Sequence, residues 1–183
     1  MGAFIAPYFL IYLDKHIISN MNVSDELKQT AISLGLCREW TDAWGNPDRG
    51  ALVEMFVEGI DFCIEHNYPS IEYIKKHFKG IAEEYGVYTD DSNVILKNPD
   101  IAILNGKCTA IITLDGYASR DIHVRHDSQA MITIEDSARA FIRVYDNAKV
   151  FVNNLGKNKV FVYKNGNAKI ETSGDVLIRK GQF

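Results

Sequence analysis

A ten-residue repeat in the second half of the chain limits its fold more than any other feature. From about residue 101 apolar and polar residues alternate, and the same pattern returns every ten residues. One column of the repeat holds Ala102, Ile112, Ile122, Ile132, Ile142, Val152, Val162 and Thr172. Turn-forming residues such as Gly106, Gly116, Asp136 and Gly166 separate about seven copies. A short fixed period with inward β-branched columns is typical of a β-solenoid (β-helix).

The length of the repeat predicts how the solenoid is wound. Ten residues are too few to encircle a filled core, so we expect two repeats in each coil, which then holds about 20 residues. Small residues, mostly Ala, flank the turn positions and suit a tight interior corner. The alternative fold is an antiparallel β-meander with one strand per repeat, because Asp115-Gly116 and Asn165-Gly166 are hairpin-type dipeptides.

The first half of the chain has helical periodicity instead. Ser24, Asp48 and Ser70 are candidate N-caps, each followed by apolar residues at helical spacing. The predicted fold class is therefore α+β, with a small helical N-terminal domain in residues 1–90 and a short single-chain β-solenoid in residues 101–183. The apolar start, residues 1–13, predicts a buried helix, because it lacks a basic flank and is too short to cross a membrane.

Composition narrows the functional class only partly. The chain has 183 residues, of which 46% are hydrophobic and 24% charged, which excludes intrinsic disorder as the main state. The first hundred residues carry 16 acidic and 8 basic side chains, whereas the remaining 83 carry 8 acidic and 12 basic ones. Three cysteines without metal-ligand spacing predict free thiols in a reducing compartment, so we expect a cytoplasmic or virion protein without a metal or cofactor.

Four segments carry a resemblance to a known family. They are Cys37–Pro47 (CREWTDAWGNP), Gly59–Ser70 (GIDFCIEHNYPS), Val124–Ser128 (VRHDS) and Val144–Val150 (VYDNAKV). Together they resemble an uncharacterised family of bacterial and prophage-associated proteins with a helical N-terminal part and a repetitive β-solenoid tail. The resemblance covers residues from about 24 to 183 and implies a mobile-element origin. It brings no assigned activity and no catalytic residue.

The outward columns of the repeat supply the candidate interaction surface. Cations and aromatic side chains recur every ten residues, namely Arg139, Lys149, Lys159 and Lys169 beside Phe141, Phe151 and Phe161. With two repeats per coil, we expect Arg139, Lys159, Phe141 and Phe161 on one face, and Lys149, Lys169, Met131 and Phe151 on the other. Such faces could pack against the helical half or a second subunit, or bind a protein, a glycan or single-stranded nucleic acid.

Other candidate residues have a structural interpretation. Trp40 and Trp44 lie four residues apart, so they share a helix face either as core anchors or as anchors for a partner. His123 and His126 are three residues apart, so in a strand their side chains point to opposite faces and cannot share a metal ion. We therefore expect one exposed histidine and one turn histidine. Acidic residues near the turns lack the calcium-binding repeat of β-rolls.

The sequence contains no catalytic constellation, so we expect a protein that is not an enzyme. The leading hypothesis is a structural or adaptor protein, from a phage or mobile element, that self-associates or binds a protein partner. The alternative is a ligand-binding module for glycan or nucleic acid that uses the Phe and Lys faces. We expect no membrane partner. We also expect residues 174–183 to close the last coil, or that coil to pair with another subunit.

Overall fold

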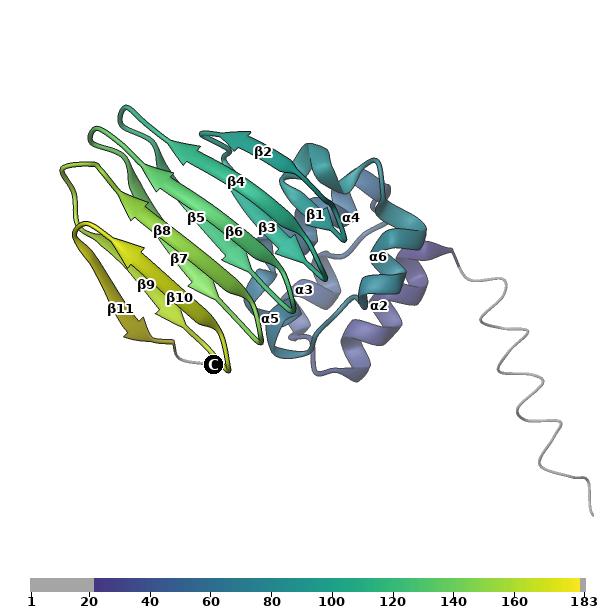
Figure 1. Cartoon of the computed structure of the whole chain (residues 1–183). Helices are drawn as coiled ribbons and strands as arrows, with labels where there is room; N and C mark the ends of the chain where they lie inside the picture. Colours follow the sequence, from purple (N-terminus) through teal and green to yellow (C-terminus); the bar gives the residue numbers. More distant parts are fainter. Residues whose placement is uncertain (1–21, 182–183) are drawn as a thin grey trace, which may run out of the picture. The chain divides into compact units, whose positions relative to one another are not determined.

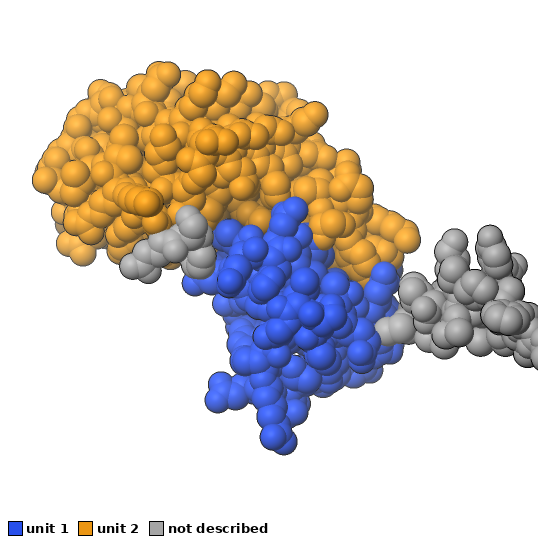
Figure 2. All heavy atoms as spheres, turned by 90° about the horizontal axis from the view of Figure 1, so that it is seen from below, with its two compact units in different colours: residues 1–69 blue, residues 70–183 orange. Residues whose placement is uncertain are grey.

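A computed structural model describes residues 22–181 of the chain. Its internal contacts divide the chain into two compact units, residues 1–69 and residues 70–183 (Figure 2). The first is called the helical unit and the second the solenoid unit. The apolar segment 1–13, for which the sequence predicts a buried helix, lies outside the described residues.

The helical unit contains short helices, several of them closed by side-chain caps. Their bounds are α2 (Val23–Ser33), α3 (Arg38–Ala43), α4 (Arg49–Glu58) and α5 (Ile60–Glu65). The predicted cap at Asp48 is confirmed, since its carboxylate accepts a hydrogen bond of 2.9 Å from the Ala51 N–H. The predicted cap at Ser24 is wrong, because the Asn22 side chain accepts from Asp25 N–H at 3.0 Å and the helix starts earlier, at Val23.

Two parallel β-sheets form the solenoid unit (Figure 1). Sheet A has the strand order β1-β3-β5-β7-β9-β11, and sheet B has the order β10-β8-β6-β4-β2. The strand bounds are β1 (Val87–Thr89), β2 (Val94–Lys97), β3 (Ile101–Asn105), β4 (Thr109–Leu114), β5 (Ser119–Val124), β6 (Gln129–Ile134), β7 (Arg139–Val144), β8 (Lys149–Asn154), β9 (Val160–Lys164), β10 (Lys169–Ser173) and β11 (Val176–Lys180). Each pairing between strands is parallel, which confirms the solenoid and excludes the antiparallel meander.

The register confirms a coil made of two ten-residue repeats. In the middle of the stack each residue pairs with the equivalent residue two repeats later, as Ile122 does with Ile142 and Ile112 with Ile132. The coils at both ends are shorter, since Val94 pairs with Ala110 and Val160 pairs with Val176. Shortened coils therefore begin and end the stack.

The interior is filled by the apolar columns that the sequence identifies. Ile112, Ile132 and Val152 from sheet B belong to one buried cluster with Ile122 and Ile142 from sheet A, and all five are fully buried. The small residues beside the turns are also buried, as expected for an interior corner; they include Cys108, Ser128, Ala138, Ala148 and Ala168. Burial of these columns away from water is the main stabilising contribution to the solenoid.

The solenoid unit starts earlier than the sequence indicates. Helix α6 (Ile71–Phe78) and the 3₁₀ helix η1 (Ala82–Tyr85) precede β1 and contact it. Ser70 caps α6 as predicted, with its hydroxyl accepting from Tyr73 N–H at 3.2 Å. Lys75 and Lys79 then reach the first turn, where their amines pair with Asp90 at 2.8 Å and Asp91 at 2.5 Å. The division into compact units falls after Pro69, so α6 and η1 belong to the solenoid unit.

The last coil departs from the repeat in a specific way. The inward position of Asn154 holds an amide that donates to the carbonyl oxygens of Asn158 and Asp175, both at 2.9 Å. These bonds join the β8–β9 loop to the β10–β11 loop and satisfy the hydrogen-bonding capacity of an amide in the interior. Residues 176–180 of the segment expected to close the end form β11, which extends sheet A beside β9. Its inward Ile178 is exposed, whereas Val162 in the same column is buried.

Two turn glycines provide a matched test of this geometry. Gly106 and Gly116 both have positive φ, +73° and +61°, but a Cβ on Gly106 would overlap the Asp90 carboxylate, whereas one on Gly116 meets nothing within 4 Å. We expect Gly116→Ala to cost about 1 kcal/mol from backbone strain. Gly106→Ala should cost about 2 kcal/mol more, because it displaces the carboxylate from Lys107 N–H and Lys75. Denaturant unfolding measures both, and equal losses would contradict this packing.

Candidate functional site

The candidate Phe and Lys residues lie on two different faces of the solenoid. Arg139, Phe141 and Phe161 belong to strands of sheet A, and Lys159 directly precedes one. Lys149, Phe151 and Lys169 belong to sheet B. The register brings together the pairs that the two-repeat coil predicts, Phe141 with Phe161 and Met131 with Phe151. The candidate residues therefore do not form a single surface, and each face has its own chemistry.

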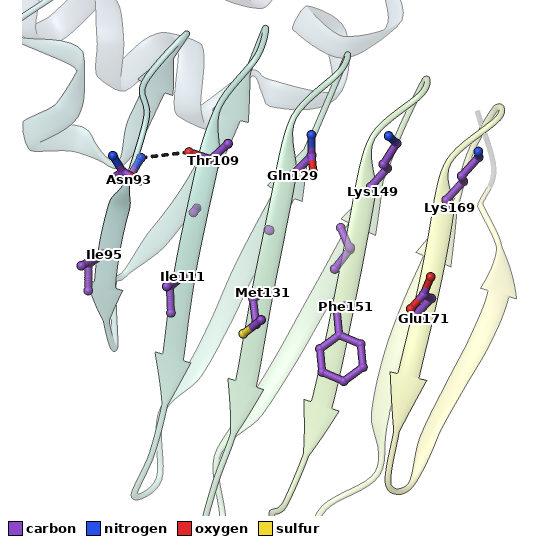
Figure 3. A pocket seen from close by; sticks show the side chains of 13 residues that line it. Asn93, Ile95, Thr109, Ile111, Gln129, Met131, Lys149, Phe151, Lys169 and Glu171 are labelled. Carbon is purple, nitrogen blue, oxygen red and sulfur yellow. Dashed lines mark hydrogen bonds between the residues drawn. The ribbon is translucent and has the colours of Figure 1, made fainter.

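The outer face of sheet B carries a row of exposed apolar side chains. Ile95, Ile111, Met131 and Phe151 are in-register neighbours on β2, β4, β6 and β8, and we call them the apolar ladder (Figure 3). Their exposed fractions are 76%, 50%, 50% and 37%. Glu171 occupies the same position on β10. Strands in a sheet lie about 4.8 Å apart, so the ladder is a continuous stripe across four strands.

A polar column runs beside the ladder and completes a shallow groove of about 500 Å³. The column consists of one residue before or at the start of each strand: Asn93, Thr109, Gln129, Lys149 and Lys169. Figure 3 shows both rows on the same face. The Thr109 hydroxyl accepts from Asn93 N–H at 2.9 Å, whereas the two lysines place the positive charge at the β8–β10 end. The groove is therefore apolar along its centre and cationic at one end of its polar side.

The outer face of sheet A is organised by interactions among its own side chains. The Arg179 guanidinium lies 4.3 Å from the centre of the Phe161 ring, a cation–π contact. Arg143 pairs with Asp121 at 2.6 Å, and Lys159 pairs with Asp175 at 3.5 Å. Several charges on this face are thus paired within the sheet.

His123 corrects one of the predictions from sequence. The sequence pattern predicts an exposed histidine, but His123 is 2% exposed, and its ring is stacked on Tyr145 with the centroids 6.2 Å apart. Burial, together with the charge of Arg143, lowers the pKa of His123 to about 4. The second expectation is confirmed, because His126 lies in a turn with φ of +58°. Its Nδ1 accepts from Gly106 N–H at 3.1 Å.

The two tryptophans of the helical unit have different environments. Trp44 is buried, and its indole N–H donates to the buried Ser24 hydroxyl at 3.0 Å, which supports its interpretation as a core anchor. Trp40 is only half-buried and lines an apolar cavity of about 270 Å³ within the helical unit, together with Leu36, Met55 and Phe62. Trp44 thus has the environment of a core anchor, whereas Trp40 is more exposed, and both residues line the same cavity.

Sequence reasoning missed half of the apolar ladder. Ile111 lies two repeats before Met131, so the same spacing that selected Phe151 could have found it. Ile95 lies less than two full repeats before Ile111, in the shortened first coil, and a strict ten-residue period passes over it. A search that allows shorter end coils would have recovered both residues.

The described part of the chain contains neither a metal cluster nor a membrane-spanning helix. Between residues 22 and 181, no group of three or more His, Cys, Asp or Glu side chains could hold a metal ion. Over the same range, no helix is both long enough and apolar enough to cross a membrane.

The chain was also compared with known proteins. Comparison with protein-family models, curated proteins and solved structures found no match to it. The class that the fold and the site define is therefore an α+β repeat protein with a parallel β-solenoid, one sheet of which carries an exposed apolar ladder.

The buried His123 predicts a specific dependence of stability on pH. Its pKa is about 4 in the folded protein, below the ordinary 6.5, so protons bind preferentially to the unfolded chain. The contribution of neutral His123 to the unfolding free energy is complete above pH 6.5 and is lost as the pH falls towards 4. Between pH 7 and pH 4.5 we expect wild type to lose on the order of 2 kcal/mol more unfolding free energy than His123→Phe, which retains a ring against Tyr145. Denaturant titrations that give both proteins the same pH slope would refute the assignment.

The contribution of the Trp44 hydrogen bond to stability can be measured with Trp40 as the control residue. Trp44→Phe keeps an aromatic ring in the core but leaves the buried Ser24 hydroxyl without its donor. We expect a loss of about 1 to 2 kcal/mol in unfolding free energy beyond the cost of the matched control Trp40→Phe. Thermal and denaturant unfolding of the two variants gives the difference. A larger loss in Trp40→Phe would make Trp40, rather than Trp44, the main anchor of the helical core.

Proposed function

We propose that this protein is a non-enzymatic structural or adaptor protein that acts by self-association and protein binding through the outer face of sheet B. The observation that supports this proposal is the apolar ladder, in which Ile95, Ile111, Met131 and Phe151 stay exposed side by side. Contiguous apolar patches rimmed by polar residues are typical of interaction sites. The polar column beside the ladder is built of hydroxyl, amide and amine side chains.

The ladder offers enough apolar surface to drive association. Complete burial of an Ile, Met or Phe side chain contributes about 1.5 to 3 kcal/mol. Each ladder residue, which we call a rung, is about half exposed, so roughly half of that free energy remains to be gained on association. The four rungs together could contribute about 4 kcal/mol before the entropy of association is subtracted. A rigid sheet loses little conformational freedom on binding, because the backbone of each rung is already fixed by parallel pairing.

The lining of the groove supports a binding role over a catalytic one. Its ionisable side chains are Lys149, Lys169 and Glu171, which lie together at one end of the ladder. The buried imidazole with a strongly lowered pKa lies elsewhere, because His123 belongs to sheet A. General acid–base catalysis needs a group with a suitable pKa within reach of the substrate, and the centre of this groove consists of Ile and Met side chains.

The biological setting is part of the proposal. The resemblance of four segments to a prophage-associated family favours a phage or mobile-element protein, and the free cysteines Cys37, Cys63 and Cys108 favour the cytoplasm or a virion. The alternative, a module for glycan or nucleic acid, is less well supported. The Phe and Lys residues that suggested it are divided between two sheets, and of the three Phe residues Phe151 alone stands beside Lys149 in the groove.

A single substitution on each sheet tests the proposal. Met131→Lys places a charge in the middle of the ladder, and the matched control Phe141→Lys alters a similarly exposed residue of sheet A. Both should change the unfolding free energy by about 0.5 kcal/mol or less, because the sites are half exposed. Affinity purification from the host cell should show proteins that are retained by wild type and Phe141→Lys and depleted at least tenfold with Met131→Lys. Equal retention by all three proteins would argue against sheet B as the binding face.

A further inference from the structure

We propose that the partner seated on the outer face of sheet B is a second copy of this chain, packed face to face about a twofold axis along β6. This inference rests on the proposed function, because it names the occupant of the same ladder. A twofold axis in that position exchanges β2 with β10 and β4 with β8, and it places β6 of one copy over β6 of the other.

The sizes of the three central ladder side chains, Ile111, Met131 and Phe151, fit this exchange. Met131 would meet Met131 of the second copy on the axis, and Ile111 would meet Phe151 of the second copy on either side. The larger Phe ring thus packs over the smaller Ile rather than over another Phe. Two sheets that pack about 10 Å apart need this interdigitation of large and small side chains.

The charges on the face also favour this axis. They are concentrated at its two ends: Lys97 on β2, and Lys149, Lys169 and Glu171 on β8 and β10. Exchange of the ends places the Lys149 amine over the Thr109 hydroxyl of the second copy and the Lys169 amine over the Asn93 side chain. Gln129 on the central strand meets its own copy, and an amide both donates and accepts hydrogen bonds. In this arrangement lysine faces neutral oxygen acceptors throughout the polar column.

The other face-to-face twofold axis is less favourable. An axis parallel to the ladder would leave each strand over the same strand of the second copy. It would place Glu171 directly against Glu171 of the second copy, and like charges in direct opposition repel each other. With the axis along β6, Glu171 instead lies over Ile95 of the second copy, because the two residues occupy the same register position on β10 and β2. Lys97 lies two residues further along β2, where it pairs with Asp115 at 2.8 Å.

The size of the face predicts a weak dimer. Five strands at about 4.8 Å and five residues at about 3.3 Å give a flat area of roughly 400 Å². Stable complexes of standard size bury about 800 Å² on each partner. We therefore expect a reversible dimer that is monomeric at low micromolar concentration and forms towards several hundred micromolar, as seen by sedimentation velocity.

Engineered cysteines test both the partner and the axis. The background is Cys37→Ser, because Cys37 is exposed while Cys63 and Cys108 are buried. On mild oxidation at high concentration, Met131→Cys should form a disulfide-linked dimer, as inter-sheet disulfides do in immunoglobulin sandwiches. Ile111→Cys alone should remain monomeric, whereas an equal mixture of Ile111→Cys and Phe151→Cys should form the mixed dimer. Tyr117→Cys, at a turn residue that is 91% exposed, is the control for random collision.

Each outcome has a definite meaning. Efficient self-linking of Ile111→Cys would overturn the axis along β6 in favour of the axis parallel to the ladder. A wild-type protein that sediments as a monomer even at several hundred micromolar, with face cysteines that link no faster than Tyr117→Cys, would overturn the second copy as the partner. In that case, continued loss of captured proteins in Met131→Lys would leave the proposed function intact. Melting curves verify that each variant is folded. Sedimentation of the wild-type protein tests the dimer without any variant.

Discussion

Parallel, in-register stacking of coils that each hold two repeats is the constraint on which the rest of this structure depends. It places Ile122 beside Ile142 and Ile112 beside Ile132, so each inward side chain packs against a residue of similar shape from the adjacent coil. The same register aligns the outward residues, which is why four apolar side chains become a ladder instead of four isolated exposures. Because side chains alternate at a period of two, a shift of one residue would exchange the inner and outer sets.

The turns maintain this register through hydrogen bonds between coils. Gly106, His126, Asp146 and Gly166 all have positive φ and occupy equivalent turns. His126 Nδ1 accepts from Gly106 N–H at 3.1 Å, and the Asp146 carboxylate accepts from His126 N–H at 2.8 Å. Each of the two side chains thus accepts a hydrogen bond from a backbone N–H of the preceding coil. Without them, these N–H groups would need water or another acceptor. Burial lowers the pKa of His126, which favours the neutral imidazole that this acceptor role requires.

The periodic part of the chain could be predicted from its sequence, and the aperiodic part could not. The ten-residue columns predict which residues share a face, because a parallel solenoid converts sequence spacing directly into spatial neighbours. The first coil was missed because it is shorter than two repeats, which breaks the period and hides Ile95. The burial of His123 was missed because strand alternation assigns a side to each residue without stating what that side contacts. Helix α6 shows the same limit, since helical periodicity did not reveal that its lysine Lys75 pairs with the first turn.

A coil built from two repeats also restricts how such a gene can change in length. Insertion of one ten-residue repeat ahead of β8 would transfer Lys149 and Phe151 from sheet B to sheet A, and with them every later strand would change sheets. The interior would tolerate this change, since both sheets present similar apolar columns, but the outer faces would be scrambled. Insertion or loss of two repeats preserves each face. Duplications or deletions in this part of the gene should therefore be retained when they involve an even number of repeats, because only these keep each outward residue on its own sheet.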